Sequence, residues 1–216
     1  MADNIKLTIY DLNRSLRPTS GVPRYSGPHG TVAAVGDFAL KVYDSPEDRS
    51  WLSDEELGKR ARSEFAIGSF LKSQHFSVPS YLGLLTVKAR DIAAFHEPAG
   101  KLPEKSKVYI TLMSRLFETE YNNLTESQKA EAESQYEASL EEARQLGLIP
   151  PENTQIWHNT LFEPDVGENG QLHFFDFFDW DVDMKSKLSL PALKKGSGLV
   201  EKVLGTNPVT FRDSQN

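Results

Sequence analysis

The sequence contains no cysteine, and it has no long run of apolar residues. The absence of cysteine excludes disulfide bonds, thiolate catalysis and cysteine-ligated metals. No apolar run approaches the length that crossing a bilayer requires, and the first residues lack the apolar centre of a secretory signal. We therefore predict a cytoplasmic protein that does not insert into a membrane.

Basic residues are fewer than acidic ones. The sequence has 24 Lys and Arg residues and 31 Asp and Glu residues, which gives a formal net charge of −7. An acidic surface is repelled by the phosphates of nucleic acids and by anionic lipids, so neither is expected as a partner. The 216 residues fit one domain or two closely packed lobes, and a hydrophobic fraction of 38% is enough for a core.

The first half of the chain has mainly strand patterns. Alternating or β-rich runs predict strands at residues 5–10, 31–35, 38–43, 78–87 and 107–113. The pair Gly36-Asp37 is typical of a two-residue hairpin turn. Residues 17–30 are rich in Gly, Pro and Ser and predict a loop.

Two helices are predicted from capping boxes that precede apolar stripes. The first follows the box of Ser53 and Glu56. The second runs from about Thr125 to Leu146, with Gln128 completing its box, and Gly147 is a plausible end.

A hairpin is predicted after the second helix. Its apolar strands are residues 160–162 and 172–178, and Asn169-Gly170 suits the tight turn between them. Residues 207–216 are polar and predict a flexible tail. The order of strands, helix, strands, helix and hairpin predicts an α+β fold with a β-rich first half.

A glycine-containing loop precedes a strand that carries a lysine. Gly27, Gly30 and Val32 are followed by Lys41 on the next strand. Glycine lets backbone N–H groups approach a phosphate closely, and the lysine ammonium can point at the same anion. The alternative is an ordinary hairpin with a surface lysine.

Glu64 lies on the helix stripe that should face the core. Because an unpaired buried carboxylate is costly, we expect a partner, and Lys41 is the natural candidate. The alternative is that Glu64 is solvated at the edge of the stripe. Glu55 and Glu56 belong to the first turn of the helix, where they suit its dipole instead.

The hairpin offers a second pair of polar residues. Asn159 precedes its first strand, and Asp176 ends its second strand within an aromatic run. The hairpin should bring these hard oxygen ligands to one place, where Mg²⁺ carrying phosphates would suit them. Asp179, Asp181 and Asp183 leave two further possibilities open, a second metal ion or an acidic solvated loop.

These motifs occur in the order of the protein-kinase-like superfamily, which the chain resembles over about residues 20–180. Gly27, Gly30 and Val32 resemble the second half of its Gly-rich loop. Lys41 and Glu64 resemble its strand lysine and the helix glutamate that pairs with it. Asn159 and Asp176 resemble the catalytic-loop asparagine and the aspartate of the Asp-Phe-Gly motif.

The resemblance implies a single bilobal domain over residues 1–216, with a β-rich N-lobe at about 20–113 and a reduced helical C-lobe at about 114–206. It implies that Lys41 holds the phosphates of ATP, that Glu64 orients Lys41, and that Mg²⁺ is bound by the ligands named above. It also implies a protein as substrate or partner. Leu112 falls near the gatekeeper position, and Met113 and Ser114 fall at the hinge, so all three join the predicted nucleotide-binding residues.

Departures from the family pattern leave the activity open. Thr154 stands where the family has its catalytic aspartate, and Glu152 stands where it has histidine. Threonine cannot serve as that base, although a local shift of the chain would offer Glu152. The chain thus resembles either a minimal kinase, like those among microbial effectors delivered into host cells, or a pseudokinase that binds nucleotide or protein. A carboxylate-dependent hydrolase built on the aspartates after residue 175 is a third interpretation.

Overall fold

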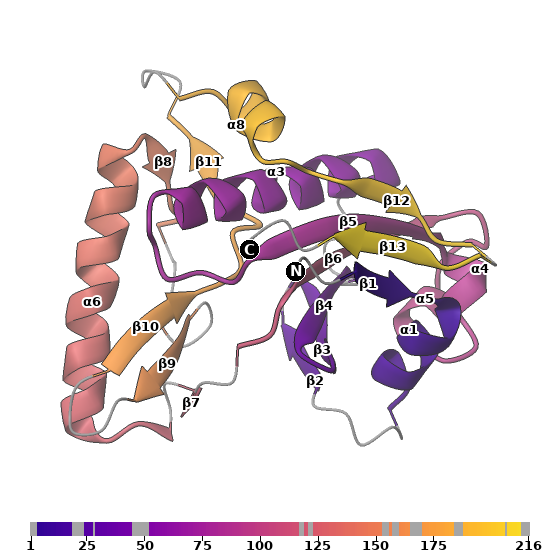
Figure 1. Cartoon of the computed structure of the whole chain (residues 1–216), viewed down its shortest axis with the longest axis horizontal. Coiled ribbons are helices and arrows are strands. Elements are labelled where there is room, and N and C mark those ends of the chain that lie inside the picture. Colours follow the sequence, from indigo (N-terminus) through magenta and orange to yellow (C-terminus); the bar gives the residue numbers. More distant parts are fainter. Residues whose placement is uncertain are drawn as a thin grey trace. The chain divides into compact units, whose positions relative to one another are not determined.

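The computed structural model describes two compact units (Figure 1). The described residues are 4–18, 24–27, 29–44, 52–116, 119–120, 123–152, 156, 160–164, 170–183, 188–205 and 207–212. The first unit comprises residues 1–65, 81–115 and 199–216, and the second comprises 66–80 and 116–198. The first unit therefore takes in residues before 20 and after 198, which the expected N-lobe leaves out. Strands and helices occur in both units, so the predicted α+β class is confirmed.

A six-stranded sheet forms the centre of the first unit, in the order β12-β5-β6-β4-β3-β2. Its strands are β2 (Arg24–Gly27), β3 (Gly30–Val35), β4 (Phe38–Tyr43), β5 (Tyr81–Lys88), β6 (Lys107–Ser114) and β12 (Glu201–Val203). Only β12 pairs in parallel, with β5. The predicted strands are confirmed for β3 to β6. Strand β2 lies within the segment that was predicted to be a loop. The sequence did not predict this strand, because its four residues show too little alternation of apolar and polar side chains.

Helix α3 (Asp54–Ser73) begins at the predicted capping box, in which the Ser53 amide donates to Glu56 and the Glu56 amide donates to the Ser53 hydroxyl. Arg62 of this helix forms a bidentate ion pair with Glu201 of β12. The Nε–Oε1 distance is 2.5 Å and the Nη2–Oε2 distance is 2.9 Å. Both residues belong to the first unit. Strand β12 therefore helps to hold the helix that carries Glu64.

An apolar core lies on the sheet face that carries Leu40, Val42 and Leu112. Further members come from α1 (Ile9–Leu16), α4 (Ala89–Ile92), β1 (Asn4–Leu7) and β13 (Val209–Arg212). Also in the unit is the short helix α5 (Glu97–Gly100).

The two ends of the described chain differ from the sequence predictions. The strand predicted at 5–10 ends at Leu7, because Thr8 and Asp11 form a capping box that starts α1. The predicted flexible tail contains β13, which pairs with β1 in antiparallel register. Phe211 explains the difference, since its ring is 1% exposed and fills the space beside Gly83. The sequence did not predict strand β13, because Phe211 is a single aromatic residue among polar neighbours.

The second unit is built around helix α6 (Glu126–Gln145), which begins at the predicted Thr125 capping box. The unit also contains helix α8 (Leu190–Gly196) and the strands β7 (Thr119–Glu120), β8 (Leu148–Ile149), β9 (Thr160–Pro164), β10 (Gly170–Phe174) and β11 (Asp181–Val182). The predicted hairpin is confirmed as β9 and β10, but Gly170, which was expected in its turn, is the first residue of β10 and pairs with Pro164. Asn169 lies outside the described residues. Gln135 joins α6 to β10 by accepting from the Leu172 amide and donating to the Gly170 carbonyl.

Tyr136 of α6 stacks on Phe174 of β10, with ring centroids 5.4 Å apart. Its hydroxyl is buried and has no hydrogen-bond partner within the described part of the chain. A buried polar group without a partner costs roughly 1–3 kcal/mol. We therefore expect Tyr136→Phe to raise the free energy of unfolding by about 1 kcal/mol, as measured by urea denaturation.

The same substitution should also change how the free energy of unfolding depends on pH in the alkaline range. Burial, followed by the charge of Glu137, raises the pKa of Tyr136 to about 12. Between about pH 10 and this value the folded state keeps the hydroxyl proton of Tyr136 while the unfolded state loses it. The contribution of this proton to the free energy of unfolding is therefore present below about pH 10 and is lost as pH rises towards 12. The advantage of Tyr136→Phe should widen above pH 10. Parallel stability curves for the two proteins would contradict this.

Candidate functional site

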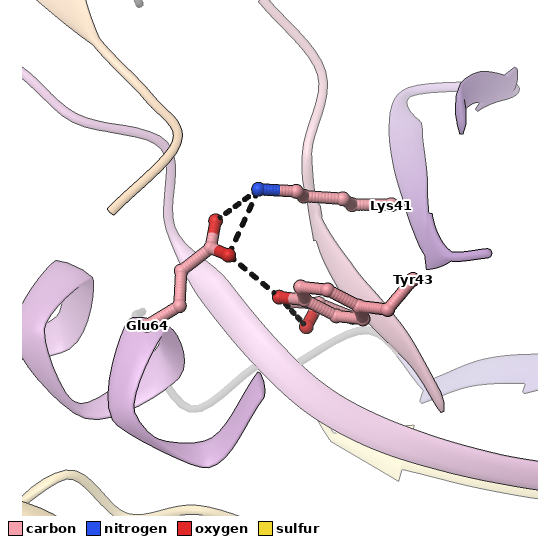
Figure 2. Close-up of polar contacts among 4 residues, drawn as sticks. Lys41, Tyr43 and Glu64 are labelled. Atoms are coloured by element: carbon pink, nitrogen blue, oxygen red, sulfur yellow. Dashed lines mark hydrogen bonds and ion pairs between the residues drawn. The ribbon is translucent and has the colours of Figure 1, made fainter. Parts of the chain in front are cut away.

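Lys41 and Glu64 form a buried ion pair in the first unit (Figure 2). Lys41 Nζ lies 2.8 Å from both carboxylate oxygens of Glu64. Lys41 is 4% exposed and Glu64 is fully buried. The expected partner of Glu64 is therefore confirmed, and the alternative of a solvated carboxylate is excluded.

Strand and helix periodicity explain how the pair is brought together. Side chains alternate along β4, so Leu40 and Val42 enter the apolar core while Lys41 points to the face beneath α3. Glu64 lies three turns into α3, on its buried side. Glu55 and Glu56 are exposed in the first turn, as predicted.

Tyr43 contacts both members of the pair, as Figure 2 shows. Its hydroxyl lies 2.9 Å from Glu64 Oε2 and 2.9 Å from Thr111 Oγ1. Its ring lies under the Lys41 ammonium, which is 5.2 Å from the ring centroid. Burial and the charge of Glu64 raise the pKa of Tyr43 well above its ordinary value. Sequence reasoning missed Tyr43, because an aromatic residue in a strand is most simply a core residue.

The predicted Gly-rich loop is the turn of the β2–β3 hairpin, in which Gly27 and Gly30 are paired. Gly30 has a φ of +136°, and a Cβ atom there would lie 1.9 Å from the Val42 carbonyl oxygen. This glycine is therefore required by the backbone itself, whatever the loop binds. Val32 lies directly opposite Lys41 in the sheet, half-buried.

The predicted gatekeeper and hinge residues are divided between the two faces of the sheet. Leu112 lies in the apolar core, on the face away from Lys41. Thr111 is directly opposite Lys41, and by alternation Met113 shares that face. Ser114 ends β6 and is half-buried. The structure therefore brings Met113, and not Leu112, to the side of the lysine.

Asp176 belongs to the second unit. The sequence predicted that it ends a strand, and this prediction is wrong. Strand β10 stops at Phe174, and Asp176 follows with a φ of +67°. This left-handed conformation is uncommon for a residue other than glycine, and such outliers are concentrated at functional sites. The end of β10 could not be predicted from the sequence, because the aromatic run continues past Phe174.

The remaining predicted catalytic and metal-binding residues are less well placed. Asn159 and Thr154 lie outside the described residues, and Glu152 is exposed on a turn. Within the described ranges, no group of three or more His, Asp or Glu side chains could hold a metal ion. No helix in that part of the chain has the length and apolar character needed to cross a membrane.

A pocket of about 600 Å³ lies elsewhere in the first unit, lined in part by Arg17, His96 and Lys101. Neither Lys41 nor Glu64 contributes to it. His96 is buried there and forms a hydrogen bond through Nε2 to Asp44 Oδ2. This second buried pair joins the segment after β4 to the start of α5, so we assign it a role in holding the fold.

Strand order and the ion pair together define the class of fold. A Gly-containing hairpin, a strand lysine and a helix glutamate that pairs with it are arranged as in protein kinases. The predicted protein-kinase-like fold is thus confirmed.

No protein-family model matches the sequence, and no curated protein matches it significantly. Among solved structures, the Rio2 kinase of Chaetomium thermophilum in complex with ADP, Mg²⁺ and phosphoaspartate is similar, with 14% identity, a TM-score of 0.49, and coverage of 82% of this chain and 52% of that chain. A second Rio2 kinase structure from the same organism has 15% identity, a TM-score of 0.49, and coverage of 82% and 54%. This chain therefore spans about half the length of that kinase.

Proposed function

We propose that this chain binds ATP with Mg²⁺ and transfers phosphate to a protein as a divergent kinase-like phosphotransferase. The observation that carries the proposal is the buried Lys41–Glu64 pair. In protein kinases a strand lysine held by a helix glutamate contacts the nucleotide phosphates, and that pair must be in place for transfer. Phosphoryl transfer depends mainly on positioning and charge neutralisation, which a fixed ammonium supplies.

The residues present fit a nucleotide by their chemistry. Lys41 would hold the α- and β-phosphates, Glu64 would orient it, and the Gly27–Gly30 turn would cover the phosphates. Bound Mg²⁺ would neutralise charge on the transferring phosphate, and Asp176 and Asn159 are the proposed ligands. Met113 stays among the proposed nucleotide-binding residues because it shares the face of Lys41.

A second candidate function is a nucleotide-binding or protein-interaction module that transfers no phosphate. It is favoured by Thr154 at the position of the catalytic aspartate and by the exposed position of Glu152 on its turn. A general base typically contributes about a hundredfold to ten-thousandfold to the rate. Loss of that group would leave binding intact and transfer slow or absent.

Titration calorimetry with ATP and Mg²⁺ tests the binding step. We expect wild type to bind, and a hundredfold excess of ligand over Kd to raise the free energy of unfolding by about 2.7 kcal/mol. Lys41→Met should lose most of that gain because it removes the ammonium. Asp176→Asn should weaken Mg²⁺-dependent binding far more than the matched variant Asp183→Asn.

Transfer of radiolabel from ATP to the protein itself and to a lysate then separates the two candidates. Transfer that Asp176→Asn abolishes supports the phosphotransferase. Binding without transfer supports the interaction module. Absence of ATP binding by wild type, with and without Mg²⁺, would refute the phosphotransferase and leave a protein-interaction module that uses no nucleotide.

A further inference from the structure

We infer that Tyr43 is a positioning residue that fixes the Glu64 carboxylate, and through it the Lys41 ammonium, for binding a nucleotide phosphate. The phosphate-binding part of this inference rests on the proposed function. The positioning part rests on the contacts of Tyr43 alone, which nothing in the kinase pattern of the sequence assigns.

The direction of each hydrogen bond follows from the donors available. An ionised carboxylate can only accept, so the Tyr43 hydroxyl donates to Glu64 Oε2 across 2.9 Å. The Tyr43 hydroxyl oxygen then accepts from the Thr111 hydroxyl, which lies 2.9 Å away on β6. Because burial and the charge of Glu64 raise the pKa of Tyr43, the phenol keeps the proton that this bond needs. Glu64 is thus held from β4 twice, by an ammonium and by a phenol.

Geometry makes this support rigid. Tyr43 and Thr111 lie on adjacent strands of the sheet, and both are essentially buried. A phenol has two torsions where lysine has four, so it loses less conformational freedom when it is fixed. The Tyr43 ring also lies under the Lys41 ammonium, at 5.2 Å. One side chain therefore restrains the carboxylate through its hydroxyl and the cation through its ring.

The test compares Tyr43→Phe with Thr111→Val. The first variant keeps the ring and removes the bond to Glu64. The second removes the other partner of the hydroxyl and keeps the Glu64 bond. Two readouts are used: the ¹⁵N signal of the Lys41 ammonium, which is observable only when exchange with water is slow, and the Kd for ATP with Mg²⁺. Circular dichroism confirms that both variants fold.

We expect Tyr43→Phe to broaden or abolish the Lys41 signal and to weaken ATP binding by about tenfold, as for loss of a hydrogen bond to a charged group. Thr111→Val should resemble wild type in both measurements. A Lys41 signal and Kd unchanged in Tyr43→Phe would overturn the inference, and equal effects in the two variants would assign the role to packing instead. If wild type binds no ATP, the proposed function fails, while the Lys41 signal still decides the role of Tyr43.

Discussion

Glu64→Leu should lower the free energy of unfolding by about 3–5 kcal/mol, because the Lys41 ammonium stays buried while its counter-ion is removed. The loss comes from desolvation, since Lys41 is 4% exposed and Glu64 is fully buried. Lys41→Met should also destabilise the protein, since it removes the ammonium that pairs with both oxygens of the buried Glu64 carboxylate. Urea denaturation at neutral pH measures both changes.

The double variant Lys41→Met, Glu64→Leu decides whether the two losses have one cause. Replacing a buried pair by apolar residues of similar volume is often neutral or stabilising, so the double variant should be more stable than either single variant. Glu55→Leu is the matched control, because Glu55 lies on the same helix and is exposed. Losses that simply add in the double variant would show that the two side chains are not coupled.

Gly30→Ala should lower the free energy of unfolding by about 2–5 kcal/mol, from a strained backbone and a steric clash together. At a φ of +136° an alanine is strained, and its Cβ would lie 1.9 Å from the Val42 carbonyl oxygen. The obstacle is backbone within a paired strand, so it cannot rotate away as a side chain would. Thermal and urea denaturation should agree on the loss.

Gly36→Ala is the control for conformation without a clash. Gly36 has a φ of +58°, and no atom lies within 4 Å of the position that its Cβ would take. We expect a cost of about 1–2 kcal/mol there, from the left-handed conformation alone. Equal losses at Gly30 and Gly36 would contradict the steric explanation. A Gly30→Ala protein that folds normally but loses ATP binding would instead favour a role for Gly30 in the phosphate site.

The Lys41–Glu64 pair could be predicted because it follows from local rules. A lysine in an apolar strand and a glutamate on an apolar helix stripe each need a partner, and their order along the chain matched them. Tyr43 could not be found in this way, because its role depends on a hydroxyl that meets Glu64, which lies 21 residues further along the chain on a different element. Sequence periodicity describes single elements and says little about such contacts between elements.

The ends of elements were harder to predict than their existence. The aromatic run around Asp176 looked like a continuous strand, yet the backbone turns at that residue. Leu112 was assigned near the gatekeeper position from the family resemblance, whereas the pleat of β6 sends it to the sheet face away from Lys41. A shift of one residue reverses the face of every side chain in a strand, so a prediction based on spacing cannot fix it.

The pairing of β1 with β13 affects how the protein folds while it is being made. Asn4 is the register partner of Arg212, so β1 has its partner strand synthesised more than two hundred residues later. At roughly 5–20 residues per second, this interval is on the order of ten to forty seconds on the ribosome. Strand β12, which carries the Glu201 partner of α3, is also made late. We expect the apolar face of the sheet to stay incompletely covered during this interval, which makes the nascent chain a substrate for chaperones.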